Sequence, residues 1–452
     1  MKENRSLCQV EQLPCACLLD SAAGCHWKTH AHNGTAAPIR HRANGAVGAL
    51  CNSPNCSVAA RLEGPEQDRR GPGRVLVTGG SGYFGFRLGQ ALARQGVSVI
   101  LLDLHKPPWD IPDGAAFYQN DIRDFDALYK ISAEVDVIFH TASYGMSGPE
   151  QLRKKQVESV NVGGTNNVIN VCTEQGISRL IYTSTVNVTF AGRPIEDGDE
   201  DSVPCVPLDM HIDHYSRTKS IADRMVLAAD GRSIKGGGVL HTCVLRPSGI
   251  YGPEERRHLH RVMVNVERRL FSFCFGNPNA QMNWVHVDNL VTAHVLAAEG
   301  LTAEKSFVAS GQAYFINDGE AVNVFEWLTP LFERLGYGRP LIHLPVSLVY
   351  SAAILMERLH VALSPIVEIP LLLTRNEVRN IAVSHTFKIE KARRDLGFCP
   401  KKYSLTDSVD QYLRTRPPRP TSSLTNTQYL LRLLLLLVLG FIVLMLCSAV
   451  WE

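Results

Sequence analysis

The chain has 452 residues, a formal net charge of +2, 20% charged residues and twelve cysteines. This length exceeds what one ordinary domain needs, so we expect a large core with additional segments. The balanced charge argues against nucleic acid as a partner. Six cysteines precede residue 57 and five are scattered singly between Cys172 and Cys399, which favours a reduced compartment over a disulfide framework.

The first 72 residues show little periodicity and no apolar signal-peptide core. The cysteines and histidines between Cys15 and His32 match no zinc ribbon or finger spacing. We therefore predict a disordered or atypical leader over residues 1–72 and no metal site.

A glycine-rich turn follows the first predicted strand. Val75–Val77 is apolar, and Gly79, Gly82 and Gly85 come at intervals of three before the helical periodicity that ends at Gly96. In a strand–turn–helix unit such glycines allow a sharp turn, close approach of backbone N–H groups to a pyrophosphate, and tight helix–strand packing. The pattern predicts a dinucleotide site.

The second predicted strand, Ser98–Asp103, ends on a carboxylate 24 residues after Gly79. At this distance an acidic residue binds the adenosine ribose hydroxyls. A carboxylate there repels a 2′-phosphate, so NAD is favoured over NADP, although His105 and Lys106 follow closely.

A third predicted strand, Ala115–Gln119, leads to Asp121 and Ile122, which we place at the adenine. The alternative for Asp121, not exclusive of the first, is the N-cap of a helix over Arg123–Ile131.

Two more buried strands are predicted at Val135–Phe139 and Arg179–Thr183. A helix over Gln156–Gly176 separates them and contains two adjacent glycines, which require close packing. His140 follows the first of these strands and is interpreted as structural.

Tyr215 and Lys219 stand at positions i and i+4, which share one face of a helix. A nearby cation stabilises a phenolate and lowers the tyrosine pKa toward working pH. The phenol then exchanges a proton with a substrate oxygen while hydride moves to or from a nicotinamide. A surface pair is the alternative, but the preceding strand–helix units make chance a poor explanation.

Five further sequence motifs, together with the Tyr215–Lys219 pair, resemble those of a known family. They are Thr78-Gly79-Gly80-x-Gly82-x-x-Gly85, Asn161-Val162-x-Gly164-Thr165, Arg246-Pro247-Ser248-Gly249-Ile250-Tyr251-Gly252-Pro253, Trp284-Val285-His286-Val287-Asp288-Asn289 and Gly311-Gln312-Ala313-Tyr314-Phe315-Ile316. Together they resemble the extended short-chain dehydrogenase/reductase superfamily. They are most similar to its 3β-hydroxysteroid dehydrogenase branch and the orphan 42E-type members of that branch, over roughly residues 74–415.

The resemblance implies Tyr215 as acid/base, Lys219 as its helper and a hydroxyl three residues before a valine. That register selects Thr185, with Ser184 as the alternative. Relatives often carry glutamate where this chain has Asp223. The predicted cofactor-binding set is Gly79, Gly82, Tyr83, Phe84, Gly85, Asp103, Asp121, Ile122, Tyr215 and Lys219.

The predicted fold class is α/β, with a Rossmann-type doubly wound parallel sheet, a smaller C-terminal substrate region and a C-terminal transmembrane helix. The expected boundaries are 73–250 for the NAD-binding domain and 251–415 for the substrate-covering region interleaved with it. The apolar stretches Leu341–Leu355 and Ile366–Leu373 are too short or interrupted to span a bilayer. Either one is a lipid-facing helix that admits a hydrophobic substrate, or they are buried.

The end of the chain predicts a membrane anchor. A linker over 416–431 precedes 432–452, in which Leu433–Trp451 gives nineteen residues without a charge, about 28 Å as a helix. Four arginines before it and only Glu452 after it place the catalytic domain in the cytosol, most plausibly at the endoplasmic reticulum. A core helix is the weaker alternative.

These features predict a membrane-anchored NAD-dependent oxidoreductase that acts on a secondary alcohol or ketone. The expected substrate is a 3β-hydroxysteroid, a sterol or a related lipid. The expected partners are a hydrophobic small molecule, the membrane and a second copy in a homodimer. Two alternatives remain: a nucleotide-sugar epimerase or dehydratase that retains NAD, and a non-catalytic membrane-anchored NAD sensor.

Overall fold

The computed structural model describes residues 73–257, 259–267, 273–363, 371–416 and 440. The predicted leader lies outside the described residues. So do the predicted linker and membrane anchor, apart from Arg416 and Gly440.

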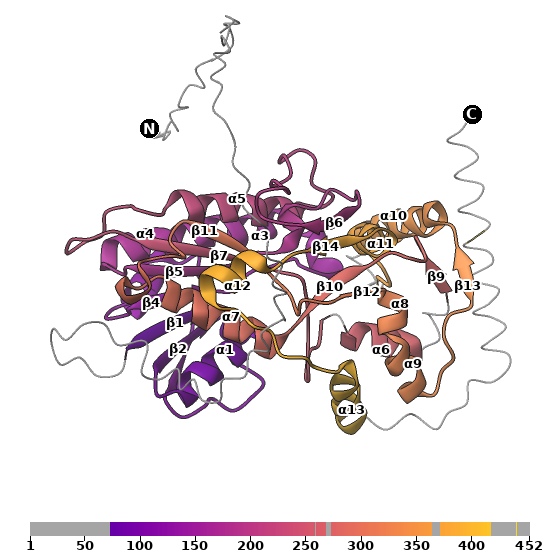
Figure 1. The fold of residues 1–452 in the computed structure, drawn as a ribbon, viewed down its shortest axis with the longest axis horizontal. Coiled ribbons are helices and arrows are strands. Elements are labelled where there is room, and N and C mark those ends of the chain that lie inside the picture. The colour runs from indigo at the N-terminus through magenta and orange to yellow at the C-terminus, as the bar shows by residue number, and fades with distance from the viewer. Residues whose placement is uncertain (1–72, 258, 268–272, 364–370, 417–439, 441–452) are drawn as a thin grey trace, which may run out of the picture. The chain divides into compact units, whose positions relative to one another are not determined.

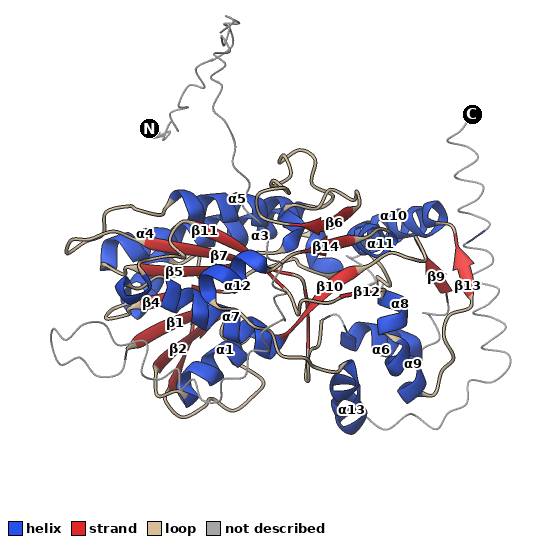
Figure 2. Ribbon diagram, in the orientation of Figure 1, coloured by secondary structure: helices blue, strands red, loops and turns tan. Residues whose placement is uncertain are grey.

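Seven parallel strands form the central sheet of the described residues, in the order β11-β7-β5-β4-β1-β2-β3 (Figures 1 and 2). Their bounds are β1 Arg74–Thr78, β2 Ser98–Asp103, β3 Ala115–Gln119, β4 Val137–His140, β5 Arg179–Thr183, β7 His241–Pro247 and β11 Gln312–Ile316. The chain is therefore α/β with the Rossmann-type sheet that the sequence predicts. The fourth strand begins two residues later than predicted and includes His140.

Helices cover both faces of this sheet because its strands are apolar on both sides. Val75 and Val77 of β1 pack in one core with helices α1 (Tyr83–Arg94), α7 (Val287–Gly300) and α12 (Glu390–Leu396), whereas Leu76 points into the other. That second core includes α2 (Phe125–Ile131), α4 (Thr165–Gln175) and α5 (His214–Ala228). Alternate strand residues thus fill two separate cores.

The helix predicted over Gln156–Gly176 is divided into α3 (Lys154–Glu158), a π-helical turn and α4. Gly164 ends this turn, and a Cβ there would lie 2.3 Å from Ile122 Cδ1. The predicted close packing is therefore present at Gly164. It is absent at Gly163, where a Cβ would meet nothing within 4 Å.

A smaller sheet and several helices complete the described structure, and all of these elements except β6 follow β7 along the chain. The strands are β6 Ile195–Gly198, β8 Gly249–Tyr251, β10 Met282–His286, β12 Ala321–Val322 and β14 His385–Phe387, with β9 Phe273–Phe275 and β13 Ile342–Leu344 paired apart from them. The helices are α6 Leu259–Glu267, α8 Val324–Trp327, α9 Thr329–Leu335, α10 Val346–Leu363, α11 Arg375–Ala382 and α13 Leu405–Thr415.

The predicted interruption of the 341–355 stretch is wrong. Helix α10 continues through Glu357, whose buried carboxylate accepts from the Arg375 backbone N–H at 2.9 Å and from its guanidinium at 2.7 Å. Among the described residues, α10 is the one helix long and apolar enough to cross a membrane, and 22% of it is buried. It lies beside α11 (Figure 1).

Candidate active site

One cavity of about 540 Å³ lies at the carboxyl ends of the central strands. Every predicted site residue lines it: Gly79, Gly82, Tyr83, Phe84, Gly85, Asp103, Asp121, Ile122, Thr185, Tyr215 and Lys219. The fold therefore brings together residues that are up to 140 positions apart in the sequence.

The glycine loop makes a tight turn in which Gly82 N–H donates to Gly79 O at 3.0 Å. A Cβ on Gly85 would lie 2.2 Å from Gly79 O, so this position requires glycine. Helix α1 begins directly after the loop, and its N-cap Gly82 leaves the first N–H groups without a side-chain partner. The buried Ser81 Oγ also has no hydrogen-bond partner among the described residues. These free donors fit a pyrophosphate.

Two carboxylates lie where an adenosine would bind. Asp103 accepts from Ser81 N–H at 3.0 Å and from Leu104 N–H at 2.7 Å, which fixes the carboxylate at the end of β2. Asp121 pairs with Arg123 at 2.5 Å. Burial raises the pKa of Asp121, but hydrogen bonds from Arg123 outweigh burial and leave this pKa below its usual value.

The alternative role of Asp121 as a helix cap is wrong. Helix α2 begins at Phe125, and its N-cap is Asp124, whose carboxylate accepts from Ala127 N–H at 3.1 Å. Asp121 lies three residues too early to cap this helix.

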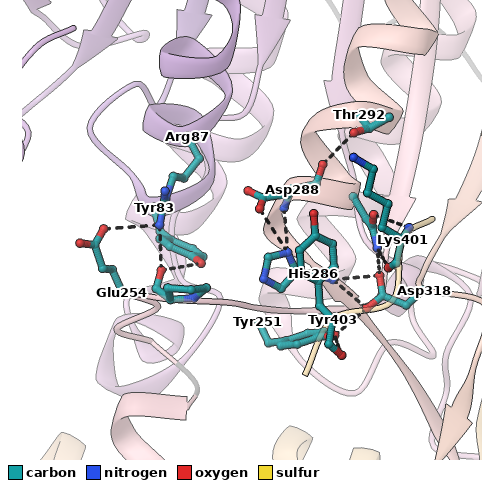
Figure 3. A network of polar contacts seen from close by, with 12 residues as sticks. Tyr83, Arg87, Tyr251, Glu254, His286, Asp288, Thr292, Asp318, Lys401 and Tyr403 are labelled. Carbon is teal, nitrogen blue, oxygen red and sulfur yellow. Dashed lines mark hydrogen bonds and ion pairs between the residues drawn. The ribbon is translucent and has the colours of Figure 1, made fainter. Parts of the chain in front are cut away.

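Tyr83 connects the glycine loop to the smaller region. Its hydroxyl donates to Pro253 O at 3.0 Å, and Arg87 donates to the same oxygen at 3.2 Å and pairs with Glu254 at 3.6 Å. Figure 3 shows these contacts beside a second group centred on Asp318. The loop after β8 is thus held against the start of α1.

Helix α5 places Tyr215 and Lys219 in the cavity. Asp213 caps this helix by accepting from Ser216 N–H at 2.7 Å and Ser216 Oγ at 2.8 Å. Tyr215 is 3% exposed and Lys219 is 1% exposed. Lys219 Nζ donates to Thr183 O at 2.6 Å.

The predicted lowering of the Tyr215 pKa is wrong for this structure. Burial raises the pKa of Tyr215 to about 12, with Asp213 adding to the rise and a Ser143 hydrogen bond and Arg257 opposing it. Burial likewise lowers the pKa of Lys219 to about 7, which the Asp223 carboxylate partly offsets. The phenol is therefore protonated at neutral pH, because burial outweighs the contacts that would favour the phenolate.

The two adjacent hydroxyls after β5 have different environments. Ser184 Oγ donates to the buried Asp223 carboxylate at 2.7 Å, and Arg246 pairs with that carboxylate at 2.8 Å. Thr185 Oγ1 instead accepts from Asn187 N–H at 3.2 Å, which leaves its own hydrogen available to a ligand. This difference supports Thr185 over Ser184.

His140 is buried between two threonines. Its Nδ1 lies 2.7 Å from Thr78 Oγ1 and its Nε2 lies 2.9 Å from Thr165 Oγ1. Burial, with a smaller contribution from the Lys219 charge, lowers its pKa to about 3. These contacts support a structural role. Within the part of the chain that the structure describes, no three His, Cys, Asp or Glu side chains form a metal-binding group.

Part of the remaining wall of the cavity comes from the smaller region, and sequence reasoning did not identify it. It includes Ile250, Val262 and Leu328 among apolar side chains. Arg261, Trp284 and Asn380 also line the cavity, and each has a buried polar atom without a partner in the described structure. They lie on three separate elements, so no short motif could have predicted their proximity.

The sequence matches a known family over most of the central region. A profile of the 3-beta hydroxysteroid dehydrogenase/isomerase family matches residues 76–346. Short-chain dehydrogenase/reductase family 42E member 1 of Mus musculus is 50% identical over 342 residues, which are 75% of this chain and 86% of that protein. The 3-beta-hydroxysteroid dehydrogenase of Mycolicibacterium neoaurum is 35% identical over 337 residues, which are 73% of this chain and 87% of that protein.

Solved structures share the fold at low sequence identity. MoeE5 in complex with UDP-glucose and NAD has a TM-score of 0.57 at 21% identity, with 76% of this chain and 99% of that chain covered. UDP-glucuronic acid 4-epimerase from Bacillus cereus in complex with NAD has a TM-score of 0.56 at 18% identity, with 75% and 99% covered.

Proposed function

Because the chain belongs to the 3-beta hydroxysteroid dehydrogenase/isomerase family, we propose that it is a membrane-anchored NAD-dependent oxidoreductase of a secondary alcohol or ketone. The substrate is a 3β-hydroxysteroid, a sterol or a related lipid. The observation that carries the proposal is the single cavity that joins the glycine loop, Asp103, Thr185, Tyr215 and Lys219.

Each of these residues has a defined part in the reaction. Bound NAD supplies the hydride acceptor for alcohol oxidation. Thr185 would donate a hydrogen bond to the substrate oxygen. Tyr215 would first lose its own proton to solvent and then, as the phenolate, take the hydroxyl proton as the carbonyl forms. Lys219 lies one helical turn beyond Tyr215 on the same helix and, in its charged form, would stabilise that phenolate. In the reverse direction, the raised pKa keeps Tyr215 protonated and ready to donate.

NAD is favoured over NADP by the carboxylate at the end of β2. Asp103 is held at the cavity by two backbone N–H groups and has lone pairs left for a ribose diol. Structural neighbours that were solved with NAD support a nicotinamide cofactor.

Two features support a hydrophobic substrate taken from a membrane. The surface that lines the whole cavity is more apolar than polar. The segment from β13 through α10 also exposes large apolar side chains, with Leu341 91%, Ile342 61% and Val361 56% exposed. Helix α10 lies against α11, which contributes side chains to the cavity wall. We place this apolar surface against the bilayer that holds the predicted anchor.

Turnover by the detergent-solubilised full chain tests the proposal. NADH formation is followed over a panel of 3β-hydroxysterols and steroids. Tyr215→Phe should lower kcat by about 10²- to 10⁴-fold, because the proton acceptor is lost, while NAD still binds. Tyr182→Phe removes a buried phenol outside the cavity and is the matched control.

Other outcomes would favour one of the two alternative functions or contradict the cofactor site. Activity on a nucleotide sugar without net NADH would establish the epimerase or dehydratase alternative. NAD binding with no turnover of any alcohol, together with a cellular effect that survives Tyr215→Phe, would establish the sensor. Failure to bind NAD would contradict the cofactor site.

A further inference from the structure

A polar patch interrupts the apolar wall on the substrate side of the cavity. Arg261 of α6 pairs with Glu377 of α11 at 2.9 Å, and its Nη2 also donates to Leu372 O at 3.2 Å. Asn376, Glu377 and Asn380 share one face of α11, since Asn380 donates to Asn376 Oδ1 at 3.0 Å across a helical turn. All four side chains line the same cavity as Tyr215.

Two atoms of this patch have unmet hydrogen-bonding capacity. Arg261 Nη1 and Asn380 Oδ1 are buried from solvent and have no partner among the described residues. Arg261 Nη1 is a donor and Asn380 Oδ1 is an acceptor. Glu377, which pairs with Arg261, lies beside Asn380, because residues three apart on a helix are neighbours. A buried polar group without a partner destabilises a protein and commonly marks a ligand contact.

The charge of the patch selects the kind of ligand group. Glu377 places both carboxylate oxygens 2.9 Å from Arg261 Nη2, so the guanidinium charge is already balanced. A carboxylate on the ligand would bring a second anion to one cation and meet repulsion from Glu377. A neutral hydroxyl avoids this repulsion and offers both an acceptor for Nη1 and a donor for Oδ1, whereas a ketone offers an acceptor alone.

We propose that Arg261 and Asn380 form a second recognition point for a neutral oxygen substituent, preferably a hydroxyl, at the end of the hydrophobic substrate remote from the reacting carbon. This inference rests on the proposed function, because Tyr215 defines the reacting end. The substrate is then an elongated hydrophobic molecule oxygenated at both ends, and a ligand with a hydrocarbon terminus leaves both atoms unpaired.

The test compares four 3β-hydroxyandrost-5-enes that differ only at carbon 17: a 17β-hydroxyl, a 17-ketone, no oxygen, and a 17β-carboxylate. With the full-length solubilised protein, kcat/KM should fall about tenfold or more from the hydroxyl to the compound without oxygen. The ketone should lie between them, and the carboxylate should be no better than the compound without oxygen.

Two variants assign the preference to the patch. Asn380→Leu removes the acceptor, and Arg261→Lys removes Nη1 while it keeps a cation for Glu377. Both should reduce the preference for the hydroxyl to within about threefold, with the compound without oxygen little affected. Thermal unfolding confirms that each variant is folded. Arg379→Lys, a change at an arginine of α11 that does not line the cavity, is the matched control.

A binding measurement separates this proposal from the proposed function. Quenching of tryptophan fluorescence, with Trp284 in the cavity wall, gives dissociation constants for the same compounds in the presence of NAD. The predicted order of affinity without turnover would support the second recognition point and contradict the oxidoreductase. Equal kcat/KM for all four compounds would overturn the recognition point alone, as would tightest binding of the carboxylate. Absence of binding by every compound would overturn both.

Discussion

The cofactor side and the substrate side of the cavity are built in different ways. The central strands pair in unbroken parallel register, and β1, β2, β4 and β5 are almost wholly buried. On the substrate side, β9, β13 and β14 have three residues each, and the β14–β6 pairing shifts register between His385 and Phe387. There, stacked side chains such as Trp284 on Trp327, with centroids 4.4 Å apart, contribute to the packing.

This difference shows which binding groups are positioned most accurately. The cofactor is recognised mainly by backbone groups and one carboxylate, which regular strands and a glycine turn position accurately. The substrate wall consists of side chains from short elements that long-range pairs such as Arg261 with Glu377 bring together. We therefore expect sharp failure from small changes on the cofactor side and graded loss on the substrate side.

The largest expected effect is at the glycine turn. Gly85→Ala places a methyl group against Gly79 O and should weaken NAD binding by about a hundredfold, or roughly 2.8 kcal/mol. Gly163→Ala is the matched control, because a Cβ there meets nothing within 4 Å. Calorimetric titration measures the NAD affinity of both variants. Equal affinities would contradict the expectation that small changes on the cofactor side cause sharp failure.

Lys219 should give a smaller, pH-dependent effect. Its folded pKa of about 7 lies below the unfolded value near 10.4, so the unfolded chain binds more protons between these values. The free energy of unfolding without NAD should therefore rise with pH, by on the order of 2 kcal/mol between pH 7 and 9. Urea unfolding of the wild type and of Lys219→Met measures this contribution, which the variant should lack. The exposed Lys235→Met serves as control; a slope unchanged in Lys219→Met would contradict the burial effect.

The smallest expected effect is on the substrate side. Thr374 and Glu377 form a capping box at the start of α11. Thr374→Ala should lower the free energy of unfolding by about 1 kcal/mol and raise KM for substrate several-fold, with NAD affinity unchanged. Steady-state kinetics with NAD and substrate varied separately would show this. A loss of NAD affinity would mean that the two sides are not separable.

The same difference explains what the sequence could predict. The five strands expected from the sequence, the glycine turn, Asp103 and the Tyr215–Lys219 spacing are local patterns. They predicted five of the seven strands of the central sheet, and β7 and β11 were not predicted as strands. The Asp124 cap of α2 was misassigned because Asp121 and Asp124 both precede the helix. The raised Tyr215 pKa depends on burial by distant segments. The continuity of α10 depends on the partner that Arg375 gives to Glu357, and no local pattern contains it.

The order of strands in the central sheet has a consequence for synthesis of the protein. Strand β11 completes the edge beside β7, and α12, which ends at Leu396, packs on β11 and α7. A nascent chain that has reached residue 250 therefore lacks one edge strand and two covering helices of its nucleotide-binding half. Stable folding must wait until nearly four hundred residues have left the ribosome. During that interval the edge of β7 that β11 later covers is open to pairing with other chains.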